Sequence, residues 1–343
     1  MGHDKPDVSH IMKKFINDPL RVTDEMVEGL VSAFPLLVRK LNEFNVVVRR
    51  DAPIQNKTGI IAGGGSGHEP FWLGYTGKGF IDATVVGAIF SSPTPQPVYE
   101  AIKAVNGGAG VLYILGNYQG DKMNFGMAEE MAKLDGIEVD SSQVTDDLAS
   151  APKGEEYRRR GIAGNFFVLK IAGAKAEEMA SLREVKAVAQ KANANTRTMG
   201  VALAPCILPA AGKPHFILGE DEMELGMGIH GEPGIERTKI KTADEVTTIL
   251  TNKILEDLPF KTGDEVAVMV NGLGSTPLLE LLIMYRRLDK ILKESEITIR
   301  RSFVGNYSTS LEMAGASITL LRLDDELQRL LNAPATTPYY IQA

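Results

Sequence analysis

Short runs of β-branched and apolar residues alternate with helical patterns through the first half of the chain, and several runs end directly in glycine. Thr23, followed by Asp24 and Glu25, is expected to cap the first helix. Alternation of this kind builds βαβ units around a parallel sheet. We therefore predict an α/β domain with a mostly parallel sheet and helices on both faces. The expected strands are 46–48, 59–61, 83–86 and 111–115, and the expected helices are 26–41, 98–105 and 123–134.

A second α/β domain, with a mixed sheet, is predicted in the C-terminal half. We place the boundary between an N-terminal domain of residues 12–195 and a C-terminal domain of residues 196–343. Residues 1–11 precede a second plausible start methionine and are interpreted as a leader or a cloning remnant. A helical stretch at 161–191, expected to break at Gly173 and near Ser181, leads into this half. Its expected strands are 199–204, 222–229, 265–270, 297–303 and 318–323. Its expected helices are 243–257, opened by a capping box of Thr242 and Glu245, and 277–293.

Composition excludes several classes of protein. Of 343 residues, 37 are Lys or Arg and 44 are Asp or Glu, so the formal net charge of −7 argues against a nucleic-acid partner. No segment reaches the ~18 consecutive apolar residues that a membrane span requires, and the start lacks a basic end followed by an apolar run, so neither membrane spanning nor export is expected. The single cysteine, Cys206, allows neither a disulfide nor a cysteine metal site within one chain. A cytoplasmic protein is expected.

The first motif with chemical potential is the glycine-rich segment that follows the strand at 59–61. Residues 63–70 read Gly-Gly-Gly-Ser-Gly-His-Glu-Pro. Glycines let a ligand approach the backbone closely, and His68 adds a group that titrates near neutral pH. A tight turn with a surface histidine is the alternative interpretation. Because the spacing is not that of a P-loop, no nucleoside triphosphate site is predicted on this chain.

The second motif, residues 116–121, follows the strand at 111–115 and ends in Asp121, at the expected start of a helix. The helix dipole would favour this carboxylate, which could take a proton from a substrate hydroxyl. A simple N-cap is the alternative. If the strands at 59–61 and 111–115 are neighbours, both motifs face the same crevice at the carboxyl ends of the strands.

The third motif places His230 between glycines, in the segment 226–234 after a strand, where the imidazole would be accessible to a small molecule. A metal site would need His68, His230 and carboxylates to converge, but no pair of histidines has ligand spacing, so no metal is predicted. His215 is interpreted as structural. The basic cluster 158–160 is interpreted as a solvated face or a partner contact.

Taken together, these motifs resemble those of the dihydroxyacetone-binding K subunit of the dihydroxyacetone kinases. The resemblance covers nearly the whole chain from Met12, and several separate motifs in the same order make it specific. The matching segments are 12–18, 63–70, 90–95, 117–125, 209–214, 228–234 and 317–321.

The resemblance implies a role for each candidate residue. His230 would bind the C2 carbonyl of a short ketose covalently, as a hemiaminal. His68 and Asp121 would act on the substrate hydroxyl as acid and base, and the segment Gly65, Ser66, Gly67 would contact the substrate through its backbone. Because an imidazole adds to a ketone but not to a polyol, this bond would separate dihydroxyacetone from glycerol.

The resemblance also implies partners. The chain carries no cofactor of its own in this interpretation: a separate nucleotide-binding L subunit would supply ATP or ADP with Mg, with a phosphotransferase-system M subunit as a further partner, and the chain would form a homodimer. The sequence ends at Ala343 without a fused nucleotide domain, so we expect the form of the kinase in which the nucleotide-binding subunit is separate. This chain is then expected to be inactive alone. Gly116 stands where the family usually has a lysine. Two alternatives therefore stay open: a non-enzymatic ketose sensor that co-activates transcription, and a kinase subunit for another ketose such as erythrulose.

Overall fold

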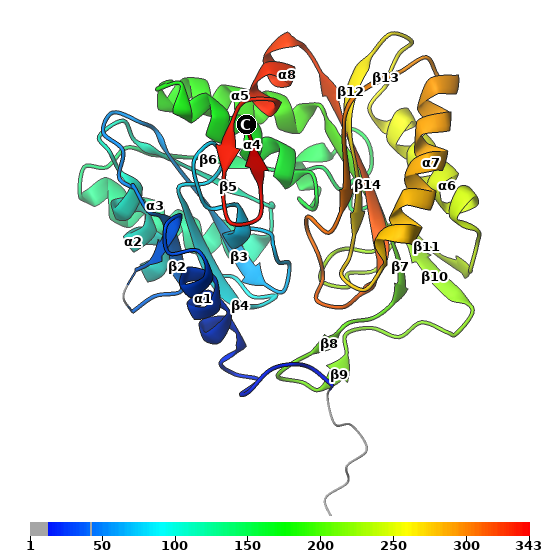
Figure 1. Cartoon of the computed structure of the whole chain (residues 1–343), viewed down its shortest axis with the longest axis horizontal. Coiled ribbons are helices and arrows are strands. Elements are labelled where there is room, and N and C mark those ends of the chain that lie inside the picture. The colour runs from blue at the N-terminus through cyan, green and yellow to red at the C-terminus, as the bar shows by residue number, and fades with distance from the viewer. Residues whose placement is uncertain (1–12, 42) are drawn as a thin grey trace, which may run out of the picture.

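The computed structural model describes residues 13–41 and 43–343, so the expected leader lies outside the described residues. Two six-stranded sheets form the framework (Figure 1). The first has the order β1-β2-β4-β3-β5-β6, with β4, β3, β5 and β6 parallel. The second has the order β11-β10-β7-β14-β12-β13, in which only β12 and β13 are parallel. The predicted α/β class, one mostly parallel sheet and one mixed sheet, is confirmed.

Elements of the first half are largely those that the sequence predicts. The strands are β1 (Val38–Lys40), β2 (Val46–Arg49), β3 (Gly59–Ser66), β4 (Ala83–Ile89), β5 (Val111–Leu115) and β6 (Val139–Gln143). The helices are α1 (Val22–Ala33), η1 (Leu73–Tyr75), α2 (Pro95–Val105), α3 (Gln119–Leu134), η2 (Glu156–Arg158), α4 (Asn165–Glu177) and α5 (Leu182–Ala194).

The second half contains the mixed sheet, three helices and two small ribbons. Its main strands are β7 (Thr196–Ala204), β10 (Glu222–Leu225), β11 (Glu236–Lys239), β12 (Glu265–Gly272), β13 (Thr298–Gly305) and β14 (Ala314–Leu323). The helices are α6 (Ala243–Asp257), α7 (Leu278–Glu294) and α8 (Asp325–Leu331). The ribbons pair β8 (Ile207–Leu208) with β9 (Lys213–Pro214) and β15 (Ala335–Thr336) with β16 (Ile341–Gln342).

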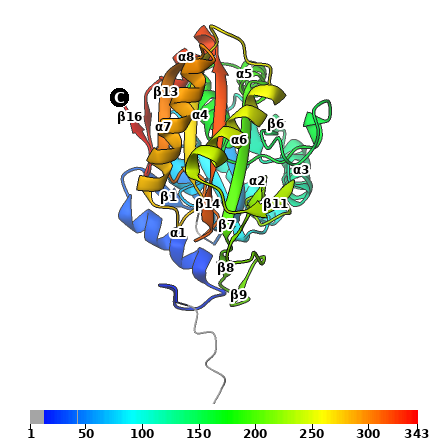
Figure 2. The ribbon, with the colours of Figure 1, turned by 90° about the vertical axis from the view of Figure 1, so that its right-hand side faces the viewer.

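Helices cover both faces of the first sheet because successive strand residues point to opposite sides. Ile60 and Ala62 of β3 belong to the core shared with α4 and α5, whereas Ile61 belongs to the core shared with α2 and α3. The second sheet packs α6 and α7 on one face, and residues such as Met269 on its other face join the α4 and α5 core. Helices α4 and α5 thus lie between the two sheets (Figures 1 and 2).

Helix α4 is buried on nearly all sides, since it lies in this central layer. This explains why the predicted break at Gly173 is wrong: the helix runs through that residue. A Cβ at Gly173 would come within 2.1 Å of the Phe80 carbonyl oxygen, so the glycine serves close packing. The predicted break near Ser181 is confirmed, with a capping box between Ser181 and Glu184.

The first helix differs from its prediction at both ends. Helix α1 begins at Val22 and ends at Ala33, and the chain then turns into β1 rather than continuing to residue 41. Thr23 lies inside the helix and makes no cap; its hydroxyl bonds the Ser66 hydroxyl at 3.0 Å. In contrast, the predicted capping box of Thr242 and Glu245 at the start of α6 is confirmed. Across the described ranges, no helix is both long and apolar enough to cross a bilayer.

Candidate functional site

The glycine-rich segment is part of strand β3, which continues through Ser66, so the predicted end of this strand at Ile61 is wrong. A Cβ at Gly63 would lie 2.3 Å from the Val85 carbonyl oxygen, and one at Gly65 would lie 2.5 Å from the Ser91 nitrogen. The glycines therefore let neighbouring backbone approach. The chain turns only at Gly67, whose φ of 102° is left-handed.

His68 follows this turn and is almost completely buried, so the surface-histidine alternative is wrong. Its Nδ1 lies 2.8 Å from the carbonyl oxygen of Thr309, in the loop between β13 and β14. The ring stacks on Phe90, with centroids 5.0 Å apart. Burial, together with the charge of His230, lowers the pKa of His68 to about 3. His68 is therefore neutral at physiological pH.

His230 contacts His68 directly, although 162 residues separate them in the sequence. The two Nε2 atoms are 3.0 Å apart. Strand β10 ends at Leu225, earlier than predicted, and the loop that follows presents His230 with 21% of its side chain exposed. The rings of Phe90 and Tyr118 lie 5.2 and 4.8 Å away, centroid to centroid. The structure thus places an accessible imidazole in an aromatic enclosure between the two sheets.

The hydrogen-bond partners determine where the protons lie. Since a carbonyl oxygen only accepts, His68 Nδ1 must donate to Thr309, and the Nε2 of neutral His68 must accept. His230 Nε2 therefore donates to His68. His230 Nδ1 lies 3.1 Å from Glu232 Oε1, which also accepts. The two Nε2 atoms thus share one labile proton, and the Glu232 carboxylate faces the other ring nitrogen of His230.

Glu232 accepts hydrogen bonds from His230 and forms an ion pair with Arg160. One carboxylate oxygen accepts the backbone N–H of His230 at 2.9 Å and lies 3.6 Å from the Arg160 guanidinium. Burial alone would raise the pKa of Glu232. The hydrogen bond and charge of His230 and the charge of Arg160 outweigh burial and lower this pKa to about 2. Arg160 also pairs with Asp147 at 2.8 Å.

The basic cluster 158–160 is therefore not a solvated face as a whole. Only Arg158 is well exposed. Arg159 is fully buried and forms a two-pronged pair with Asp257 of α6. The segment that carries these arginines thus links the His230 loop to the second sheet's helices.

Asp121 lies in the first turn of α3, which begins at Gln119, so it is not the N-cap residue. The carboxyl group is nearly buried, and its Oδ1 has no hydrogen-bond partner within the described part of the chain. Burial raises the pKa of Asp121, and a hydrogen bond with Ser92 and the charge of His230 oppose that rise. Strands β3 and β5 are neighbours, which puts Asp121 and His68 at the same sheet edge, as expected.

The structure separates Ser66 from the other candidates. Its hydroxyl points to Thr23 of α1. Backbone contact of Gly65, Ser66 and Gly67 with a substrate stays a prediction, although the Gly67 carbonyl already accepts the N–H of Leu311 and its own N–H bonds the Glu69 carboxylate.

Sequence reasoning missed residues that complete the site. Phe90 and Tyr118 lie in the segments 90–95 and 116–121 that the sequence analysis singled out, but neither was given a role, and nothing in the local sequence marks Thr309. Glu232 was available as a signal, because it lies two residues after His230 within the same motif. Among residues 13–41 and 43–343, no three His, Cys, Asp or Glu side chains are grouped to hold a metal ion.

Gly116 is packed too closely to be exchanged for a larger residue without movement. A Cβ there would lie 2.9 Å from the Gly161 carbonyl oxygen and 3.1 Å from the Tyr118 ring. Asn117 then adopts a left-handed φ of 62°, with its side chain donating to the backbone of Tyr157 and Arg159. This turn directs Tyr118 toward His230, and the glycine at position 116 gives no side-chain donor to the site.

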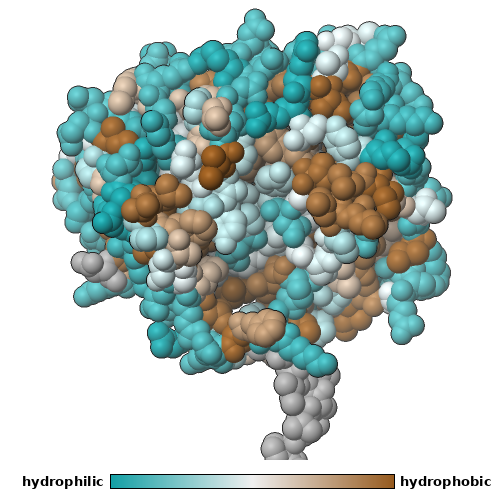
Figure 3. Space-filling model, viewed as in Figure 1, coloured by the Kyte–Doolittle hydropathy of each residue, from teal (hydrophilic) through white to brown (hydrophobic). Residues whose placement is uncertain are grey.

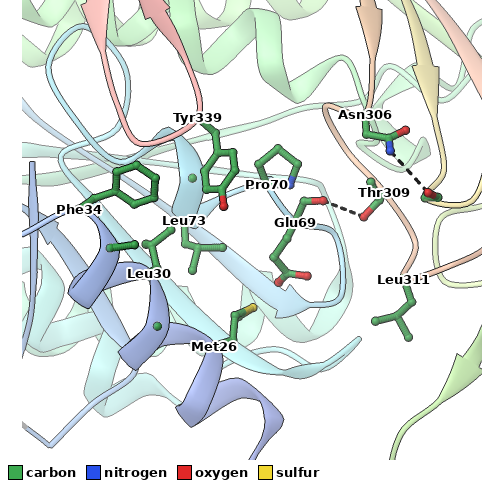
Figure 4. A pocket seen from close by; sticks show the side chains of 14 residues that line it. Met26, Leu30, Phe34, Glu69, Pro70, Leu73, Asn306, Thr309, Leu311 and Tyr339 are labelled. Carbon is green, nitrogen blue, oxygen red and sulfur yellow. Dashed lines mark hydrogen bonds between the residues drawn. The ribbon is translucent and has the colours of Figure 1, made fainter. Parts of the chain in front are cut away.

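A cavity of about 720 Å³ lies on the other side of the His68 turn, between α1 and the loop after β13 (Figure 4). Its wall is mostly apolar, with the carboxyl group of Glu69 at one side, and burial raises the pKa of Glu69. The Thr309 hydroxyl donates to the Glu69 carbonyl oxygen at 2.9 Å. Neither His68, Asp121 nor His230 lines this cavity, so it is distinct from the site between the histidines.

Comparison with known proteins places the chain in a family. The Dak1 domain matches residues 28–339. The chain belongs to the Dak1 domain family. It is 49% identical over 96% of its length, and 99% of the relative, to the dihydroxyacetone-binding subunit DhaK of PTS-dependent dihydroxyacetone kinase 2 of Listeria innocua. It is 40% identical over 95% of its length, and 98% of the relative, to the DhaK subunit of the PEP-dependent kinase of Escherichia coli.

Other Dak1 relatives differ in named activity. D-erythrulose kinase of Mycolicibacterium smegmatis is 44% identical, with 96% of this chain covering 56% of that protein. Among solved structures, the dihydroxyacetone kinase operon co-activator DhaQ superposes with a TM-score of 0.87 at 34% identity, covering 93% of this chain and 98% of DhaQ. The dihydroxyacetone kinase of C. freundii superposes with a TM-score of 0.86 at 36% identity, covering 96% of this chain and 60% of that one.

Proposed function

We propose that this chain is the dihydroxyacetone-binding subunit of a dihydroxyacetone kinase and that it holds the ketose covalently on His230. The observation that carries the proposal is the contact between His230 Nε2 and His68 Nε2 at 3.0 Å, with Glu232 on the opposite ring nitrogen. Near-full-length relatives named as dihydroxyacetone-binding subunits support the substrate.

The contact supplies both the nucleophile and the proton that carbonyl addition requires. His230 Nε2 passes its proton to His68 Nε2 and then forms a bond to C2 of the ketose. The carbonyl electron pair moves to oxygen, which takes the proton from His68 and becomes a hydroxyl. Bond formation makes the His230 ring a cationic, N-substituted imidazolium whose Nδ1–H lies on the Glu232 carboxylate, and His68 is again neutral. Glycerol has no carbonyl carbon and cannot complete this step.

Phosphoryl transfer then requires a base at the terminal hydroxyl and a donor from outside this chain. Asp121 is the proposed base, because burial raises its pKa and its Oδ1 has no hydrogen-bond partner among the residues that the structure describes. The proposed donor is ATP, or ADP recharged by a phosphotransferase-system M subunit, bound with Mg to a separate L subunit. The names of the Listeria innocua and Escherichia coli relatives, which are subunits of PTS- and PEP-dependent kinases, support this division.

Self-association is part of the proposal, as is a cytoplasmic location. Apolar side chains gather on the side of the molecule where α7 lies (Figure 3), and those of Leu278, Leu279, Leu282 and Ile283 are largely exposed. An apolar face of this kind is typical of contact with another chain, and it supports the proposed homodimer. A free, buried Cys206 is compatible with a reducing compartment.

A second candidate function is a ketose-sensing co-activator. The superposition on DhaQ with a TM-score of 0.87 favours it, and the glycine at position 116 removes a donor that the kinase family usually has. The match to D-erythrulose kinase favours a four-carbon ketose as the substrate of the kinase version.

Reconstitution tests these candidates. The full chain is combined with an L subunit and either ATP or a phosphotransferase-system donor, and dihydroxyacetone or erythrulose is supplied. Product phosphate ester is expected, and His230→Ala is expected to abolish it. Ketose binding by the full chain without product under either donor would overturn the kinase and leave the sensor. A crystal soaked with dihydroxyacetone that shows the ketone unattached to His230 would overturn the covalent step.

A further inference from the structure

Trp72 places an unused hydrogen-bond donor beside Asp121. It follows the end of β3 and precedes η1, and only 8% of its surface is exposed. The ring packs on Phe71, with centroids 4.0 Å apart. Its Nε1 is buried and has no hydrogen-bond partner in the described part of the chain, as is also true of Asp121 Oδ1. Buried donors of this kind are rare, because leaving one unpaired is unfavourable.

The Trp72 indole and the Asp121 carboxylate, the latter through its other oxygen Oδ2, border the same small space over Gly64. A Cβ at this glycine would be 3.4 Å from Trp72 Nε1 and 3.5 Å from Asp121 Oδ2. Gly64 therefore keeps open a space between one side chain that can only donate and one that, when ionised, only accepts. A hydroxyl group, which can accept from the first and donate to the second, matches this pair.

Trp72 is also separate from the cavity of Figure 4. Pro70, Leu73 and Gly74 line that cavity, whereas Trp72 does not, and its indole nitrogen lies by Gly64 instead. The segment 70–74 thus has two sides: one borders the apolar cavity, and the other faces Asp121.

We propose that Trp72 is a substrate-binding residue whose indole N–H donates a hydrogen bond to the terminal hydroxyl of the bound ketose. This inference rests on the proposed function. Asp121 accepts the proton of that hydroxyl, so the oxygen is held between the two side chains and its free lone pair points to the incoming phosphoryl group. As the oxygen gains negative charge during attack, the N–H continues to stabilise it. With glycine at position 116, Trp72 supplies a donor that this position lacks.

The chain contains one tryptophan, so its intrinsic fluorescence reports on this position alone. Titration of the full chain with dihydroxyacetone is expected to change the indole emission saturably, with the same midpoint that calorimetry gives for binding. Glycerol is the control ligand and is expected to leave the emission unchanged. This measurement needs no variant.

Substitution gives a second, independent readout in the reconstituted kinase. Trp72→Phe keeps an aromatic ring and removes the N–H. It is expected to lower kcat/KM for the ketose about tenfold, through both KM and kcat, because the N–H contacts the hydroxyl in the bound ketose and the charged oxygen during transfer. The matched control is Tyr75→Phe, in the same segment, which removes a hydroxyl that donates to the Tyr307 carbonyl oxygen. This control is expected to alter stability and to leave kcat/KM unchanged.

The outcomes distinguish the role of Trp72 from the proposed function of the chain. Ketose binding with unchanged Trp72 emission, or a Trp72→Phe variant with wild-type kcat/KM, would overturn the role of Trp72 and leave the proposed function intact. Absence of any ketose binding by calorimetry would overturn both.

Discussion

Substitution of Glu232 by glutamine tests the arrangement around His230 directly. Glu232→Gln preserves the size of the side chain but removes the negative charge that faces His230 Nδ1 and the Arg160 guanidinium. The backbone N–H of His230 also loses its ionised acceptor. We expect both the free energy of unfolding and the affinity for ketose to fall.

The magnitude follows from the pKa of Glu232. A fall from 4.5 to about 2 corresponds to about 3 kcal/mol of stabilisation of the ionised form in the folded protein. Because 30% of the Glu232 side chain is exposed, solvent screening reduces this figure, and we expect a loss of about 2 kcal/mol at pH 7.

The loss should depend on pH in a defined direction. The folded-state pKa lies below the unfolded one, so the stabilisation is complete above the unfolded value near 4.5 and disappears as the pH falls toward 2. Urea unfolding at pH 7 and pH 3, followed by circular dichroism, measures it. The difference between wild type and Glu232→Gln should shrink to less than about half of its pH 7 value at pH 3.

The matched control is Glu236→Gln, at the exposed start of strand β11, which removes the same charge four residues further along the chain. It should leave both stability and ketose binding within about 0.5 kcal/mol of wild type. Equal stability of Glu232→Gln and wild type at pH 7, or a deficit that persists undiminished at pH 3, would refute the charge pair described here.

Three further predictions concern the framework of the site. Gly63→Ala should lower the free energy of unfolding by about 3 kcal/mol or more, because its Cβ would lie 2.3 Å from the Val85 carbonyl oxygen. Gly126→Ala, whose Cβ meets open space within α3, should raise it by about 1 kcal/mol. Thermal unfolding compares the two variants, and equal effects would contradict the close packing at Gly63. His68→Asn should flatten the rise of stability between pH 3 and 6.5, since His68 has a pKa of about 3 when folded and the unfolded chain binds the proton throughout that window; an unchanged slope in urea unfolding would argue against a buried neutral His68. Asp257→Asn should cost about 3 kcal/mol in chemical denaturation because two largely buried arginines share this carboxylate, and a neutral effect would show that the cluster is not stabilising.

Much of the fold could be predicted because local patterns carry it. Alternating apolar runs located most strands, and the capping box at Thr242 located the start of α6. The predictions failed where tertiary contacts decide. Gly173 looks like a helix breaker until the close approach of the Phe80 carbonyl is known. Thr23 looks like a cap until its bond with Ser66 is seen.

The candidate site was only partly predictable, for a similar reason. His68, Asp121 and His230 stand out because each follows a strand within a glycine-rich motif. Their partners do not, since Thr309 and Trp72 lie in segments with no such signal. For Arg159 the sequence pattern favoured the wrong environment, because a run of charges is typical of a solvated surface. Arg159 is buried instead, since it pairs with Asp257 of α6, 98 residues further along the chain.

The sequence by itself determined the α/β class, the family and three chemical groups of the candidate site, because strand periodicity and glycine-rich motifs are local properties of the chain. Only the tertiary structure decided how those groups act on one another. The contact between the two imidazoles and the neutral state of His68 depend on burial and on a loop carbonyl, and the orientation of His230 depends on the carboxylate beside it. Protonation depends on burial and on neighbours, and these exist only once the two sheets have packed together.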